Sequence, residues 1–446
     1  MGAAVAARGA DVSRATRLSA LLGVARSPRQ VYFGWWVVVC AFVVATFAWG
    51  VGFYGPSIFL AALHLKHGWP VSLTSAAVTA HFLVSAGIVS QIARLHVRLG
   101  LVAVTRLGAA SASAGMLGWA LAAAPWQLFP AALLTGTGFA LTSGAAINAM
   151  VSPWFRRLRP AALGAAFNGA SVGGIVFAPL WQFLIVRLDL LGAAVVMGAA
   201  MTGSLWWCAG RFLRPTPESL GLLPDGAAVQ AAEARAEPAA RQPALPAGAA
   251  ALTDRRFLTL SAAFSLGLFA QIGIIVTLVL VAAPMLGEDW ASVAVSLVTA
   301  CAIAGRTLVG MLLPARSDWR IVASGNFTLQ AVGTLALVAA GTQSLVLLLA
   351  GCVLFGIGVG SQLSLPPQIA GVEFTPTDAP RVMALVTAAN QTSYAFAPAI
   401  LGLLRDLSRG STAPLLMMVL MQALAAAIVL SGRSAAGSGT DAPPRQ

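Results

Sequence analysis

Residues 107–155 read LGAASASAGMLGWALAAAPWQLFPAALLTGTGFALTSGAAINAMVSPWF and contain no charged side chain. One apolar helix of about 20 residues crosses the roughly 30 Å hydrocarbon core of a lipid bilayer. The stretch is therefore long enough for two membrane spans, and Pro125-Trp126 near its middle predicts the turn between them. Because lipid offers no hydrogen-bond partners, each backbone group must be paired within the chain, which favours helices.

The composition extends this pattern to the whole chain. Of its 446 residues, 58% are hydrophobic and only 9% are charged, whereas a soluble domain carries about 25% charged residues. A chain this apolar could not cover its surface in water, so its solvent is lipid. The net charge of +13 does not indicate nucleic-acid binding, because the basic residues lie between apolar runs and not in one patch.

The same criterion predicts an all-α membrane protein with twelve spans in two pseudo-symmetric six-helix bundles. In the N-terminal half, residues 32–211, the expected spans are 32–63, 70–93, two within 107–155, 160–186 and 190–210. In the C-terminal half, residues 257–432, they are 257–286, 290–313, two within 321–372, 382–404 and 412–432. The remaining segments are expected to be a tail over 1–31, a proline-rich linker over 212–256 and a disordered tail over 433–446.

The distribution of basic residues predicts the orientation. With the N-terminus in the cytoplasm, the cytoplasmic segments collect 22 basic residues, the outer loops hold 4, and Arg306 remains inside a span. Cytoplasmic loops of membrane proteins carry such an excess of Lys and Arg. The first long apolar run is far longer than the apolar region of a signal peptide, so we expect a retained first span. Both termini are then cytoplasmic, and we expect a multi-pass protein of a bacterial inner membrane.

Three local motifs occur in order along this plan. Residues 32–38 read YFGWWVV, residues 154–164 read WFRRLRPAALG, and residues 217–226 read PESLGLLPDG. Together with the six-plus-six plan, they make residues 32–432 resemble the monocarboxylate-transporter and oxalate/formate-antiporter branch of the major facilitator superfamily. The resemblance implies a secondary active transporter whose halves rock about a midplane site, the alternating-access mechanism. We expect a monomer with a small-molecule carboxylate substrate and no cofactor.

The superfamily's motif between spans two and three is incomplete. The aligned stretch over 93–100 reads ARLHVRLG, so Arg98 and Gly100 remain while Val97 stands where the motif has an aspartate. The counterpart in the second half, GMLLPAR over 310–316, also lacks the acid. In the family these loops latch one half against the other. The residues expected to take part in conformational gating are Arg98, Gly100, Arg156, Arg157, Gly310 and Arg316.

Arg306 lies about midway along the predicted eighth span. A charge at that depth is costly unless it faces a polar cavity or a partner, which makes such a residue a candidate for a functional site. A guanidinium pairs bidentately with a carboxylate. The related carriers bind the substrate carboxylate with an arginine in span eight, and Arg306 matches that position. The alternatives are that Arg306 reaches an interface or caps backbone carbonyls.

The acidic residues are informative by their positions. All fourteen fall in loops, tails or span ends, so we expect no carboxylate partner for Arg306 within the membrane. The aspartate that eukaryotic monocarboxylate carriers pair with this arginine is missing, since Ala302 and Ile303 occupy the preceding turn. The span-eleven lysine of the oxalate/formate antiporter is missing as well. One cation suits a small monocarboxylate better than a dicarboxylate.

His81 is the only histidine within a predicted span. Histidine titrates near neutral pH, so His81 could carry a coupling proton; a neutral, hydrogen-bonded structural histidine is the other interpretation. Polar residues at other central positions could complete a cavity or form hydrogen bonds between helices. With Arg306 and His81, the predicted substrate-binding residues are Tyr54, Asn148, Asn168, Gln271, Gln362, Asn390, Gln391 and Tyr394.

The sequence contains no Ser-His-Asp constellation, no metal-ligand spacing and no paired carboxylates, so we expect neither enzymatic activity nor a metal site. Two other functions stay open: a multidrug or hydrophobic-solute exporter on the same fold, and a non-transporting membrane sensor. Arg306 and the three motifs argue against the exporter. The short, low-complexity linker and tails argue against a sensor with a soluble output domain. Uniport, anion exchange and proton symport all remain possible.

Overall fold

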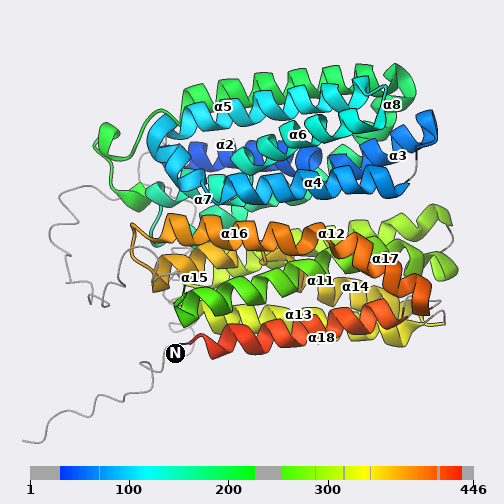
Figure 1. Cartoon of the computed structure of the whole chain (residues 1–446). Helices are drawn as coiled ribbons and strands as arrows, with labels where there is room; N and C mark the ends of the chain where they lie inside the picture. The colour runs from blue at the N-terminus through cyan, green and yellow to red at the C-terminus, as the bar shows by residue number, and fades with distance from the viewer. Residues whose placement is uncertain are drawn as a thin grey trace, which may run out of the picture.

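The computed structural model describes residues 31–69, 71–226, 253–286, 288–314, 317–341, 343–408 and 412–433. Every regular element in these ranges is a helix, and the helices lie side by side in two bundles (Figure 1). Nearly all of the predicted tails, much of the predicted linker and the predicted gating residue Arg316 lie outside the described residues.

The N-terminal half forms the upper bundle in Figure 1. Its first span is divided into α2 (Phe33–Phe47), a π-helical segment η1 (Ala48–Phe53) and α3 (Gly55–His67). The other long helices are α4 (Val71–Val89), α5 (Ile92–Leu121), α6 (Leu128–Thr142), α7 (Gly144–Val151) and α8 (Arg159–Phe212). Between α5 and α6, a 3₁₀ turn over Pro125–Gln127 confirms the predicted turn. Two spans lie within α8, because Asp189 has a φ of 62° that interrupts the helix.

The C-terminal half forms the lower bundle and repeats this order. Its first four spans are α11 (Arg255–Leu286), α12 (Glu288–Leu312), α13 (Trp319–Ala340), and α14 (Leu345–Gly360) followed by α15 (Leu365–Glu373). The last two are α16 (Ala379–Ala395) with α17 (Ala397–Ser408), and α18 (Thr412–Ser431).

The predicted fold class is confirmed. Ten stretches of the described chain are long and apolar enough to cross a membrane. The second span is α4, whose apolar part is the shorter stretch Ala76–Val89. The eleventh is the pair α16 and α17, divided at Phe396. Together they make twelve spans in two six-helix bundles.

The first span differs from the continuous helix expected over 32–63. Its π-helical segment loosens the regular backbone ladder, and two side chains bond to the carbonyls there. Trp181 Nε1 donates to the Gly50 oxygen at 3.3 Å, and His81 Nε2 lies 2.8 Å from the Gly52 oxygen. Bare glycines are required, because a Cβ at either position would collide with the ring of Phe177 or Phe139. A break in a membrane helix is tolerated where neighbours satisfy the freed backbone groups.

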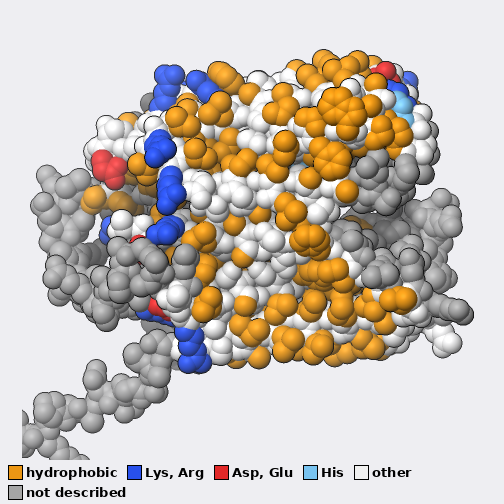
Figure 2. All heavy atoms as spheres, in the orientation of Figure 1, with side chains coloured by type: hydrophobic (Ala, Val, Ile, Leu, Met, Phe, Trp, Pro, Cys, Tyr) orange, Lys and Arg blue, Asp and Glu red, His pale blue; other side chains and the backbone are white. Residues whose placement is uncertain are grey.

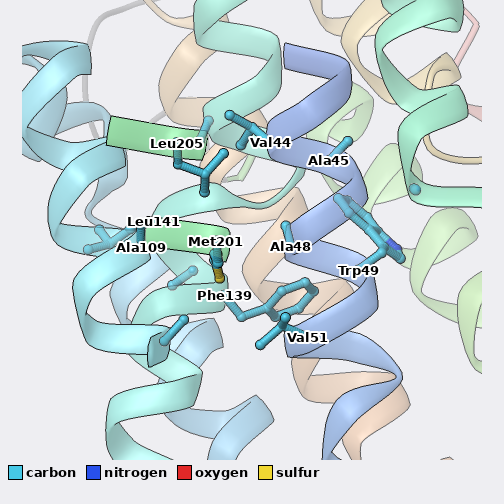
Figure 3. Close-up of a cluster of buried hydrophobic side chains, with 14 of the residues drawn as sticks. Val44, Ala45, Ala48, Trp49, Val51, Ala109, Phe139, Leu141, Met201 and Leu205 are labelled. Carbon is cyan, nitrogen blue, oxygen red and sulfur yellow. The ribbon is translucent and has the colours of Figure 1, made fainter. Parts of the chain in front are cut away.

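The two halves have differently divided cores. In the N-terminal half the buried side chains form one continuous cluster. Figure 3 labels Val44, Ala48, Val51 and Trp49 along the first span together with Phe139 of α6, whose ring centre lies 5.8 Å from that of Trp49. The C-terminal half has two apolar clusters. Between them lies a buried polar layer of Gln330, Thr334 and Gln422, in which the Thr334 hydroxyl donates to the Gln422 oxygen at 3.0 Å.

The kind of side chain on the surface changes along the length of the spans. Hydrophobic side chains cover the middle of the molecule, and the visible Lys and Arg side chains gather mainly at the end where α7 and α15 lie (Figure 2). We call this end the basic end. An apolar belt between polar ends is the surface that a lipid bilayer requires.

Candidate functional site

A cavity of about 90 Å³ lies between the two halves. The N-terminal half contributes residues from η1, α6, α7 and α8, and the C-terminal half contributes residues from α11, α12, α14, α15 and α16. Because about 10–15 Å³ of such space suffices to hold one water, the cavity has room for several waters or a small organic molecule. The cavity therefore has the position and size of a site for a small solute.

Arg306 of α12 lies in the wall of this cavity and is only 3% exposed. Its Nε donates to the Gly360 carbonyl of the same half. Its Nη1 reaches across to α8, where the Phe167 carbonyl lies at 2.7 Å, Asn168 Oδ1 at 3.1 Å and Ser171 Oγ at 3.3 Å. The guanidinium thus joins the two halves, and its Nη2 makes no hydrogen bond within the described part of the chain.

The charge of Arg306 is not balanced by an acid. The ion pairs among the described residues involve Arg256, Arg320 and Arg433, and none involves Arg306. All its partners are neutral oxygen atoms. Moving a charge out of water is expensive unless a counter-charge or a hydrated cavity compensates it. An anion entering the cavity would supply that counter-charge.

Polar side chains surround the cavity near Arg306. Buried oxygens of Gln271 and Gln391, and both polar atoms of the Gln362 side chain, have no hydrogen-bond partner within the described chain. Asn390 Oδ1 accepts from the Ser265 hydroxyl at 3.1 Å. Buried polar groups are rarely left unpaired, so these amides are free to bond to a solute or to water.

Aromatic rings form part of the apolar wall, beside aliphatic side chains such as Leu268, Ile275 and Val298. Phe53 of the N-terminal half lies 5.8 Å, ring centre to ring centre, from Tyr394 of the C-terminal half. Phe82 of α4 lies 5.3 Å from the same ring. Sequence reasoning had named Tyr394 but neither phenylalanine, because an aromatic residue in a span looks the same whether it faces lipid, the core or a cavity. The cavity residues missed in this way are Trp49, Phe53, Phe139 and Phe167.

The ten predicted substrate-binding residues fall into two groups. Seven line the cavity, namely Arg306, Tyr54, Gln271, Gln362, Asn390, Gln391 and Tyr394. Asn168 is outside the lining but contacts both Arg306 and Thr307, to which its Nδ2 donates at 3.0 Å. Ser171 and Thr299 also line the cavity and were not predicted.

His81 and Asn148 lie away from the cavity lining. His81 is fully buried inside the N-terminal half, with Nδ1 at 2.9 Å from the Thr135 hydroxyl and Nε2 at 2.8 Å from the Gly52 carbonyl. Both ring nitrogens are therefore occupied by protein partners. Asn148 accepts hydrogen bonds from Ser152 and Arg159, which places it toward the basic end.

Three predicted gating residues lie at a helix break, in a groove between the halves and at a close contact between helices. Gly100 has a φ of 78°, a conformation that favours glycine, and it separates the first turns of α5 from the third span. Arg98 is exposed and shares a groove with Arg381 of the other half. At Gly310, an added Cβ would lie 3.0 Å from the Pro160 carbonyl, so α12 and α8 approach closely there.

The predicted gating residues Arg156 and Arg157 make their hydrogen bonds through their backbone amides. The Asp225 carboxylate, from the chain that follows α8, accepts hydrogen bonds from the amides of Arg156 at 3.2 Å, Arg157 at 2.7 Å and Leu158 at 3.0 Å. These three amides precede the first residue of α8, so the carboxylate fixes the turn that leads into this helix. The side chains of both arginines are exposed. The third sequence motif, which contains Asp225, is thus bound to the second.

Two six-helix bundles around a small cavity are the architecture of a membrane carrier, and the cavity is lined by a buried arginine that forms no ion pair within the described chain. The sequence model of the Major Facilitator Superfamily matches residues 142–398, more than half of the chain, and the chain belongs to this superfamily of transporters. It is a multi-pass membrane protein.

The curated relatives that match are monocarboxylate transporters. Monocarboxylate transporter 12 of Rattus norvegicus is 36% identical over 110 residues, which are 24% of this chain and 22% of that protein. Monocarboxylate transporter 3 of the same species is 32% identical over 189 residues, 42% of this chain and 37% of that protein. These matches confirm the resemblance drawn from the three motifs, but they span well under half the length of either relative.

Solved transporter structures share the fold. The fucose:proton symporter of E. coli superposes with a TM-score of 0.63 at 14% identity, covering 90% of this chain and 99% of that chain. The human organic anion transporter MFSD10 superposes with a TM-score of 0.61 at 16% identity, covering 89% and 99%. At these identities the likeness is one of fold alone.

Proposed function

We propose that this protein is a secondary active transporter that moves a small organic monocarboxylate across the membrane by alternating access. The observation that carries the proposal is Arg306: it lines the cavity between the halves, is 3% exposed, and forms no ion pair within the described chain. A carboxylate is the partner that a guanidinium binds best. The names of the matching relatives point to the same substrate class.

The other cavity residues suit such a solute. The hydroxyls of Tyr54 and Tyr394 make no hydrogen bond within the described chain and, with the free amides of Gln271 and Gln362, offer donors to an anion or to a polar substituent. The aromatic wall suits a short apolar tail. One cation and a small volume favour a monoanion over a dianion.

Contact with both halves gives Arg306 a part in the transport cycle. Its Nη1 bonds to α8 while its Nε bonds within the C-terminal half. A carboxylate that competes for these donors would loosen the link between α8 and α12, and the halves could then move apart. We propose that the basic end is cytoplasmic, as the distribution of basic residues predicts, and that the membrane is a bacterial inner membrane. The proposal does not include proton coupling through His81, because both of its ring nitrogens bond to protein and it lies outside the cavity lining.

Reconstituted protein provides the test. Proteoliposomes would be assayed for uptake of labelled pyruvate and lactate by the native chain, Arg306→Gln and Arg306→Lys. Because a hydrogen bond to a charged group contributes about 1.5–3 kcal/mol, two lost bonds should lower kcat/KM at least 100-fold in Arg306→Gln, and Arg306→Lys should lie between. The matched control is Arg433→Gln, which removes an exposed arginine.

Arg306 also bonds to two carbonyls, so uptake would fall as well if Arg306→Gln destabilised the fold. The melting temperature without ligand distinguishes a loss of stability from a loss of substrate binding. A thermal-shift screen with organic acids should show stabilisation of the native chain that Arg306→Gln loses. Intact uptake in Arg306→Gln would end the carboxylate proposal. Flux of hydrophobic cations would favour the exporter, and ligand binding without flux would favour the sensor.

A further inference from the structure

A second groove lies on the lipid-facing side of the N-terminal half at the basic end. It has a volume of about 700 Å³ and lies between α5 and the last turns of α8. Below it the two helices are joined, because the Ser113 hydroxyl contacts the Gly198 carbonyl at 3.1 Å and the Thr202 hydroxyl at 2.8 Å. The groove is lined by Arg106, Thr202, Gly203, Trp206, Trp207, Gly210, Arg211 and Arg214.

Arg106 is positioned by the groove wall. Its guanidinium carbon lies 5.0 Å from the centre of the Trp206 ring, and its Nη2 donates to the Trp206 carbonyl at 3.3 Å. Its Nε is buried and has no hydrogen-bond partner within the described chain. Open space lies at Gly203 in the same groove, where a Cβ would meet nothing within 4 Å. The groove wall thus holds the guanidinium of Arg106 in place through the ring and carbonyl of Trp206.

The three arginines of the groove have no acidic partner. None forms an ion pair within the described part of the chain. At the matching end of the C-terminal half, by contrast, Arg433 pairs with Asp318 at 2.9 Å and Arg320 pairs with Glu373. Uncompensated cations in one groove repel each other, so their arrangement favours an anionic occupant.

The groove also lies where a lipid headgroup would be. Trp207 is 64% exposed and Leu107, next to Arg106, is 50% exposed, so both face the surroundings of the bundle. Tryptophan is enriched at the membrane–water interface, and basic pockets between spans on the cytoplasmic side bind anionic headgroups. Apolar surface below the arginines gives the acyl chains a place to lie.

We propose that this groove binds the phosphate headgroup of an anionic phospholipid of the cytoplasmic leaflet. Arg211 and Arg214, both exposed, reach the headgroup from the end of α8, and Arg106 holds it from α5. The proposal rests on the cytoplasmic orientation of the basic end and is independent of the transported solute. The bound lipid would join the third span to the sixth.

Native mass spectrometry of the full chain in detergent tests this site. Phosphatidylglycerol, cardiolipin and phosphatidylcholine would be titrated against the native chain and the variant Arg106→Gln/Arg211→Gln/Arg214→Gln. Each basic residue at a membrane surface contributes about a fivefold gain in binding of an anionic lipid. The triple variant should therefore bind the anionic lipids on the order of 100-fold more weakly, while phosphatidylcholine binds weakly to both.

The matched control removes the same charge elsewhere at the basic end. Arg156→Gln/Arg157→Gln/Arg381→Gln changes three exposed arginines outside the groove and should retain lipid binding. Equal losses in the two triple variants, or equal affinity for phosphatidylcholine, would overturn the proposal. Displacement of the lipid by millimolar inorganic phosphate alone would show a site for free phosphate instead. These outcomes do not depend on transport, so they are separable from a failure of the carboxylate proposal.

Discussion

The two halves hold their basic ends together in different ways. In the C-terminal half, Arg320 is 2% exposed and bonds to both carboxylate oxygens of Glu373, with Nη2 to Oε2 at 2.8 Å. Its remaining donors reach Thr259 and the Val429 and Arg256 carbonyls, so one guanidinium joins the ends of four spans. In the N-terminal half the corresponding contacts are not ion pairs. Within the described chain, Arg159 donates to the side-chain oxygen of Asn148 at 3.3 Å, and the Asp225 carboxylate binds the backbone amides just before α8.

A second contrast concerns the second span of each half. In α4 the titratable residue His81 is buried behind the cavity, with both nitrogens bonded to protein. In α12 the charged residue Arg306 faces the cavity. The two halves share a helical plan but contribute differently. The C-terminal half supplies the charge at the cavity and forms ion pairs at its basic end, while the N-terminal half supplies neutral oxygens and rings to the cavity. Four substitutions sharpen or break this comparison.

The largest effect is expected from Glu373→Gln. It leaves the buried Arg320 guanidinium without its counter-charge, and breaking one partner of a buried pair costs about 3–5 kcal/mol. The melting temperature in detergent should fall by about 5–10 °C. Arg433→Gln is the control, because its pair with Asp318 is 40–49% exposed and is expected to contribute less than about 1 kcal/mol. Equal shifts in the two variants would show that the buried Arg320–Glu373 pair contributes no more stability than the exposed Arg433–Asp318 pair.

Asp225→Asn tests the linker contact of the N-terminal half. Asparagine tolerates the positive φ of 64° at this position, so the backbone is retained while the charge and one of the two acceptor oxygens are lost. The expected cost is about 1–3 kcal/mol, because backbone amides lose hydrogen bonds to a charged acceptor. Hydrogen exchange of the amides at 156–158 should become about tenfold faster. Glu218→Gln, in the same segment, should leave the exchange rate unchanged. Unchanged exchange in Asp225→Asn would show that the carboxylate does not hold the turn before α8.

Much of the fold could be predicted because the bilayer restricts the possibilities. A charge-free run such as 107–155 must be two helices, since hydrocarbon thickness sets the length of a span. Arg306 could be recognised for the same reason, because a cation in the middle of an apolar run has to be explained. The breaks in spans could not be predicted. The π-helical segment depends on Gly50 and Gly52 meeting the rings of Phe177 and Phe139, which lie far away in the sequence.

The candidate site was less predictable than the fold. Position along a span says how deep a residue lies but not which way it faces. Asn148 and Gln362 are both polar residues in spans, yet Gln362 lines the cavity and Asn148 bonds toward the basic end. Likewise Phe53 lines the cavity while Phe59 is buried in the core of the N-terminal half. Only the packing of the helices distinguishes such pairs.

His81→Gln compares the two second spans. Glutamine can still donate to the Gly52 carbonyl and accept from Thr135, so we expect a loss of about 1 kcal/mol or less in stability. Uptake should change less than threefold, with its pH dependence retained, because His81 lies outside the cavity lining. Uptake into proteoliposomes is measured between about pH 5.5 and 8, a range that spans the ordinary titration of histidine. A flat pH profile in this variant alone would instead assign proton coupling to His81.

The smallest effect is expected where the N-terminal half is given an acid like that of the other half. Asn148→Asp places a carboxylate beside Arg159, whose Nη2 already donates to the Asn148 oxygen, in a position only 5% exposed. The new ion pair gains attraction but loses hydration of two groups, and these terms nearly cancel at buried sites. We expect the melting temperature to rise by no more than about 2 °C. If the melting temperature rises by as much as Glu373→Gln lowers it, the basic ends of the two halves are equivalent. The difference between them then follows from the amide of Asn148 alone. A paired substitution with Arg159→Gln decides this, because the gain must vanish when Arg159 is absent.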